Sequence, residues 1–105
     1  ITRIRLDSVA RTAMTRLAEL QLAGGEPEKA LRWAAKAQSE NALDERAGRL
    51  MILSLLATGD RAGAVTVANT LDSALHEAAL APEADTRRAF ERVGIVPTAS
   101  PPGPE

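Results

Sequence analysis

The chain of 105 residues has 13 basic and 14 acidic side chains, 45% hydrophobic residues and only 2% aromatic residues. This length fits one domain with a modest core, and the net charge of −1 argues against a domain that binds nucleic acid with its whole surface. The absence of cysteine excludes disulfides, thiolate nucleophiles and cysteine-based zinc sites.

Abundant alanine and leucine, with few residues that favour strands, predict an all-α fold that begins with a helix over residues 2–23. Gly24-Gly25 ends this helix, because glycine readily takes the left-handed conformation that follows a helix. A second helix is predicted from Pro27 to about residue 41, with Trp33 on its flank. The first helix carries an apolar stripe of Ile4, Val9, Ala13, Leu17 and Leu20, and the inner face of the second is Ala30, Leu31, Ala34 and Ala37.

Three further helices are predicted after this hairpin. Asp44 caps a helix over 45–57 that is apolar nearly all round, as expected for the middle of a stack. A glycine turn at Gly59 precedes a helix over 61–79, and Pro82 precedes a last helix over 83–93. The buried faces of these two helices are predicted to be Ala64, Val65, Ala68, Leu71 and Leu75, followed by Ala89, Phe90 and Val93. The proline-rich residues 96–105 are expected to form a disordered tail or linker after a domain of residues 1–95.

The two helix pairs repeat with an offset of 34 residues, which pairs Gly25 with Gly59 and Ala30 with Ala64. This period is typical of a tetratricopeptide unit. We therefore expect a right-handed stack of two tetratricopeptide-like helical hairpins, followed by a C-terminal capping helix. The small residues Ala30, Ala34, Ala64 and Ala68 are predicted to lie where the helices of each pair cross closely.

No constellation of catalytic residues is recognisable in the sequence. The only histidine, His76, is expected on a helix surface, and one histidine without cysteine is too little for a typical zinc site. The glycines lack the spacing of a phosphate-binding loop, and the acidic pairs fall at helix N-termini, where the helix dipole explains them. We therefore expect no enzyme, no cofactor and no bound metal.

The first and last helices each carry a run of arginines that we interpret as a solvated face, and two other surfaces are candidates for binding. The first helices of the two repeats would line a concave groove, in which Arg46 and Arg49 project together and would capture a carboxylate or phosphate. Alternatively, these arginines pair with Glu45, with Glu19 or with segments beyond the chain. Trp33 is either an anchor for a neighbouring domain or subunit, or a cover for the edge of the core. The candidate groove comprises Thr12, Thr15, Glu19, Arg46, Arg49 and Leu53.

The segment 75–93 resembles the bacterial transcriptional activator domain of actinobacterial antibiotic-regulatory-type regulators. Residues in step with the family pattern are Leu75, Glu77, Pro82, Asp85, Thr86, Arg87 and Phe90, and the resemblance extends over residues 3–93 through both hairpins. The chain departs from the family at Ala68, where an aromatic residue is usual, and at Ala79-Leu80, where a Leu-Gly pair is usual. The resemblance implies a regulatory and oligomerisation module that follows a winged-helix DNA-binding domain and does not itself bind DNA.

The resulting hypothesis is a non-catalytic protein-interaction module of a bacterial transcriptional regulator in the cytoplasm. Its partner would be its own DNA-binding domain, a second subunit of a homodimer, or a signalling protein. The alternatives are an adaptor domain of a multidomain signalling protein and a sensor of small anionic ligands. The chain begins with Ile1 and has neither a signal-peptide pattern nor a membrane-spanning run, so we expect part of a longer protein without a membrane partner.

Overall fold

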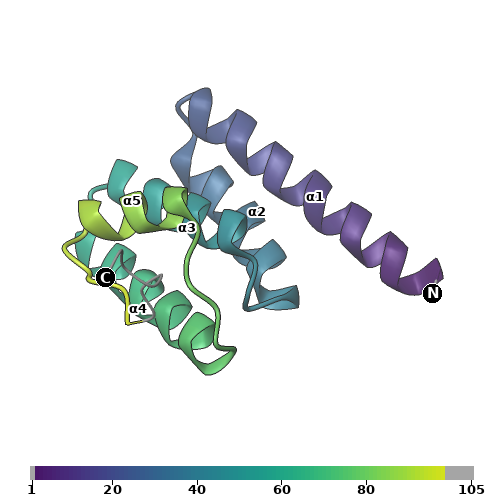
Figure 1. The fold of residues 1–105 in the computed structure, drawn as a ribbon. Helices are drawn as coiled ribbons and strands as arrows, with labels where there is room; N and C mark the ends of the chain where they lie inside the picture. Colours follow the sequence, from purple (N-terminus) through teal and green to yellow (C-terminus); the bar gives the residue numbers. More distant parts are fainter. Residues whose placement is uncertain (1, 99–105) are drawn as a thin grey trace.

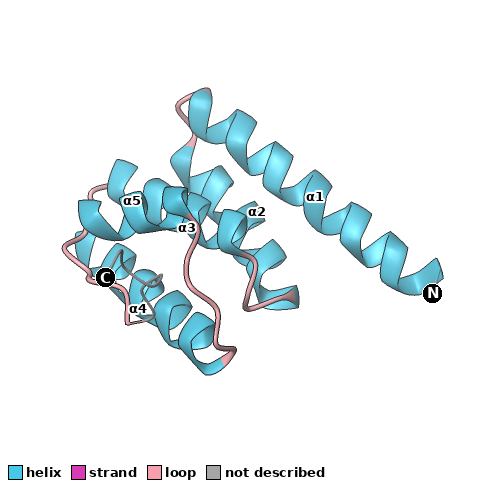
Figure 2. Cartoon of the chain, in the orientation of Figure 1, coloured by secondary structure: helices cyan, strands magenta, loops and turns pink. Residues whose placement is uncertain are grey.

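The computed structural model describes residues 2–98, and the side chains from residue 8 onwards. These residues form five helices and no strand, which confirms the predicted all-α fold. Figure 2 shows how the helices and the loops between them are arranged. Each helix begins and ends within two residues of its predicted bounds. The helices are α1 (Thr2–Ala23), α2 (Pro27–Glu40), α3 (Glu45–Ala57), α4 (Arg61–Glu77) and α5 (Ala84–Arg92).

The turns within the two hairpins repeat the same chemistry 34 residues apart. Gly25 and Gly59 take positive φ angles of 78° and 83°, a conformation that costs glycine little. At each turn the next backbone N–H bonds back to a carbonyl five residues earlier, from Glu26 to Gln21 at 2.8 Å and from Asp60 to Leu55 at 2.9 Å. The internal repeat seen in the sequence is therefore present in the backbone geometry.

The middle helix α3 is the centre of the molecule (Figure 1). It packs along α2 on one side and α4 on the other, and it also contacts α1 and α5. Its N-terminus is capped by Asp44, whose Oδ1 accepts a hydrogen bond from the backbone N–H of Ala47 at 3.1 Å. The prediction that the nearly all-round apolar helix lies in the middle of the stack is confirmed.

The core has a C-terminal part, which is one cluster, and an N-terminal part, which consists of two clusters that both contact the half-buried Trp33, and α3 contributes to both parts. Leu50 belongs to the N-terminal part, whereas Ile52 belongs to the C-terminal part. Every alanine predicted at a helix crossing is fully buried. The N-terminal part contains Met14, Ala18, Ala30, Ala34, Ala37, Ala47 and Leu50, and the C-terminal part contains Ile52, Ala64, Ala68, Leu71, Leu75, Ala89, Phe90 and Val93.

Most of the predicted apolar stripe of α1 does not face the core, although Leu17 is half-buried and the side chain of Ile4 lies outside the described part of the chain. Val9 and Leu20 are 61% and 64% exposed, whereas Met14 and Ala18 are buried against α2. The prediction was wrong because α1 carries two apolar rows of helical spacing. The row that includes Met14 and Ala18 is the one that meets the small side chains of α2, and the other row is left on the outside.

The residues that follow α5 return to α4. Asp72, which is almost fully buried, accepts hydrogen bonds from the backbone N–H of Thr98 at 2.9 Å and from its hydroxyl at 2.6 Å. The predicted tail of residues 96–105 is thus bound to α4 at Thr98, and its residues 99–105 lie outside the described part of the chain. Among the described residues, no helix is long and apolar enough to cross a membrane.

Candidate functional site

Arg46 of the predicted groove is paired with Glu19 and so joins α3 to α1. Its Nε donates to Glu19 Oε2 at 3.2 Å, and its Nη2 bonds the other carboxylate oxygen. Both side chains are about two-fifths exposed. The hydrogen bonds to Glu19 raise the pKa of Arg46 above its ordinary value, so the guanidinium stays charged.

Arg49 turns the other way and holds the start of α5. Its Nη1 donates to Glu83 Oε1 at 2.9 Å and to the hydroxyl of the fully buried Thr86 at 3.0 Å. In the same contact the backbone N–H of Glu83 donates to Glu45 Oε1 at 2.8 Å. The first two turns of α3 therefore fix the N-terminus of α5 through one carboxylate and one guanidinium, an arrangement that we call the α5 clamp.

The two arginines predicted to project together are thus neutralised by different neighbours. The alternative in which an arginine pairs with Glu19 is the one that the geometry favours for Arg46. An anion that entered the groove would have to displace Glu19 from Arg46, or Glu83 from Arg49. The two arginines of the predicted groove therefore form ion pairs that join α3 to α1 and to the start of α5.

The remaining groove residues offer little to a ligand. Thr15 is buried, and its hydroxyl donates to backbone carbonyls of its own helix, the nearer being that of Thr12 at 3.0 Å. Thr12 is exposed, but its hydroxyl also bonds a carbonyl of α1, that of Ser8 at 3.0 Å. Leu53 is half-buried. The two threonine hydroxyls are therefore used by hydrogen bonds within α1, and Leu53 is partly covered by its neighbours.

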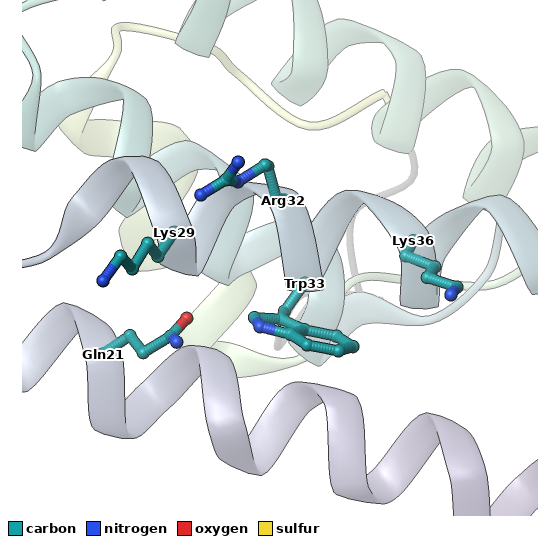
Figure 3. Close-up of a pocket in the computed structure, with 5 residues that line it drawn as sticks. All are labelled: Gln21, Lys29, Arg32, Trp33 and Lys36. Atoms are coloured by element: carbon teal, nitrogen blue, oxygen red, sulfur yellow. The ribbon is translucent and has the colours of Figure 1, made fainter.

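Trp33 lies at the rim between α1 and α2. Its half-buried ring packs against the N-terminal core, and its outer side borders a shallow pocket of about 310 Å³ (Figure 3). The Nζ of Lys36 lies 6.0 Å from the centre of the ring. The pocket, which we call the Trp33 groove, is lined by Gln21, Lys29, Arg32, Trp33 and Lys36.

The Trp33 groove carries positive charge that is only partly neutralised. Lys29 pairs with Glu26 at 3.4 Å, and both side chains are about half exposed. Arg32 and Lys36 are exposed and form no ion pair with another described side chain. The amide oxygen of Gln21 is buried without a hydrogen-bond partner among the described residues.

Sequence reasoning singled out Trp33 but missed the cations around it. Lys29, Arg32 and Lys36 recur at steps of three and four, so they share one face of α2 with the ring. That spacing was visible in the sequence. The contribution of Gln21 from α1 was not, because it depends on how the two helices cross.

The described residues contain no group of three histidine or acidic side chains that would hold a metal ion. His76 is exposed near the end of α4. The stacked helical hairpins place the chain in a class of α-helical modules.

A family model for the bacterial transcriptional activator domain matches residues 1–93, and the chain belongs to this family. The family places it as a module associated with transcriptional regulators. Comparison with curated proteins and with solved structures gave no match.

Proposed function

We propose that the chain is a non-catalytic protein-interaction module of a bacterial transcriptional regulator, and that its function lies in the contacts it makes. The observation that carries the proposal is the Trp33 groove. A half-buried aromatic ring beside exposed cations is the composition typical of residues that dominate protein interfaces. The partner is the DNA-binding domain of the same regulator, a second subunit or a signalling protein, and the compartment is the cytoplasm.

The pairing of the groove arginines favours this function over a sensor of small anions. Arg46 and Arg49 are held by Glu19 and Glu83, and Arg49 also supports the buried hydroxyl of Thr86. A free anion would gain these guanidinium groups only by displacing Glu19 or Glu83 from them. The cost of leaving a buried hydroxyl without its partner opposes that exchange.

The balance of charge also favours a protein partner over direct DNA binding by this chain. A DNA-binding surface typically carries a broad basic patch that neutralises several phosphates. Here the net charge is −1, and the cations of the Trp33 groove are bordered by Glu26 and Glu40 at the two ends of α2.

The test compares transcription from a target promoter with the full-length regulator and with its Trp33→Ala variant. We expect the variant to activate about tenfold less, the effect of losing 1.4 kcal/mol of partner binding, while operator affinity in a gel shift is unchanged. A Trp33→Phe variant is the matched control and retains most of the activation. Full activation by a regulator in which an unrelated helical domain replaces this module would refute the proposal.

A further inference from the structure

We infer that the Trp33 groove binds a short acidic segment of a partner protein, with an apolar side chain of that segment against the indole ring. This inference rests on the proposed function, because it names the chemistry of the partner. The groove combines exposed cations with an aromatic ring, and the cations select the acidic side chains of such a segment whereas the ring selects its apolar side chain.

The cations set the charge and the length of the segment. Lys29 and Lys36 are seven residues apart on α2, so the positive stretch is about 10 Å long. At about 3.3 Å per residue, this length matches roughly three residues of an extended peptide. The exposed Glu26 and Glu40 bound the stretch at either end and repel a longer anion. A nucleic acid strand, whose charges continue past this length, fits less well.

The ring of Trp33 distinguishes a peptide from a free anion. Figure 3 shows the ring lying between α1 and α2, with Lys29 and Lys36 on the neighbouring turns of α2 and Arg32 pointing away from α1. An apolar side chain of a peptide packs against such a ring, whereas an inorganic phosphate supplies no apolar group for it.

The experiment uses the intrinsic fluorescence of the chain, which reports on this groove alone because Trp33 is its only tryptophan and it has no tyrosine. The probe is a synthetic peptide of sequence Glu-Leu-Glu with blocked termini, whose length matches the positive stretch, and the control peptide has lysine in place of both glutamates. We expect a saturable change in emission with the acidic peptide only. The affinity should fall as salt is raised, because exposed charges are screened.

Two charge-reversal variants locate the binding. Arg32→Glu removes an exposed cation of the groove and should weaken the acidic peptide about tenfold or more. Arg61→Glu makes the same charge change at an exposed residue at the start of α4 and should alter the affinity by less than about twofold. Circular dichroism verifies that both variants are folded.

Several results would overturn the inference. These are the absence of a saturable change with the acidic peptide, equal weakening by both variants, and an identical change with inorganic phosphate. Tighter binding of a short DNA duplex that is lost in Arg32→Glu would instead assign the groove to nucleic acid. The promoter test is independent of these outcomes, since it measures whether the regulator needs Trp33 and not which chemistry the groove recognises.

Discussion

Replacing Phe90 by alanine removes the largest fully buried side chain of the described residues. Phe90 lies in the C-terminal core with Ile52, Leu71 and Leu75, and it is the only phenylalanine of the chain. Truncating a buried phenylalanine costs about 3–5 kcal/mol, because transfer energy is lost and a cavity remains. Domains of this size have a total stability of about 5–15 kcal/mol, so the variant should lose a large part of it.

The loss should reach the opposite end of the molecule through α3. Leu50 packs in the N-terminal core and Ile52 in the C-terminal core, so neither part unfolds without disturbing the same helix. Urea unfolding of Phe90→Ala is followed by far-ultraviolet circular dichroism and by the emission of Trp33. With a slope of about 1–3 kcal/mol/M, both midpoints should fall together by at least about 1 M.

The control is Leu43→Ala, which changes a more exposed residue of the loop between α2 and α3 and should alter stability by about 0.5 kcal/mol or less. The reasoning is refuted if the Trp33 transition keeps the midpoint of the parent chain while circular dichroism records an earlier loss of helix. The two parts of the core would then unfold separately, and α3 would not couple them.

Three further substitutions each test one local feature, two of them a hydrogen bond and one a backbone conformation. Arg49→Met removes the donor to the buried Thr86 and should lower the free energy of unfolding by about 1–3 kcal/mol in urea titrations; an unchanged midpoint would contradict the α5 clamp. Ala79→Gly should stabilise the chain by about 0.5–1 kcal/mol in thermal melts, because Ala79 has a φ of 58° that glycine adopts without strain, and a lower melting temperature would disprove this. Asp72→Ala should speed hydrogen exchange at the Thr98 amide about tenfold or more, since it removes a charge-assisted bond; equal exchange rates would show that Asp72 does not hold this segment.

The features of the fold that could be predicted are those encoded locally. Asp44 and Asp60 each precede a helix and accept a bond from a backbone N–H three residues later. Gly25 and Gly59 end helices in the left-handed conformation. Because each of these signals acts within five residues, the helix bounds follow from the sequence with small errors.

The face of α1 that meets the core could not be predicted in the same way. Two apolar rows on that helix satisfy the helical period, and only the approach of α2 decides between them. The row with Met14 and Ala18 is buried, whereas Val9 and Leu20 are mostly exposed. The spacing of apolar residues predicts that a helix has an apolar face, but where two faces fit the spacing it does not predict which one is buried.

The ion-pair partners of Arg46 and Arg49 could not be predicted either, because they lie far away in the sequence. Arg46 bonds a residue 27 positions earlier, and Arg49 bonds a residue 34 positions later. Their spacing of three predicts neighbouring side chains. In the structure, however, Arg46 forms an ion pair with Glu19 of α1, whereas Arg49 forms one with Glu83 at the start of α5. The direction of a long charged side chain depends on which carboxylate the packing brings close, which is a property of the whole fold.

The small side chains of the N-terminal core explain why Trp33 lies partly at the surface. The inner face of α2 consists of alanines such as Ala30, Ala34 and Ala37, which are fully buried. The half-buried ring of Trp33 packs beside them, with one side on the core and the other toward Lys36. Because alanine side chains extend little beyond the backbone, they cover only the inner side of the ring, and its outer side borders the Trp33 groove.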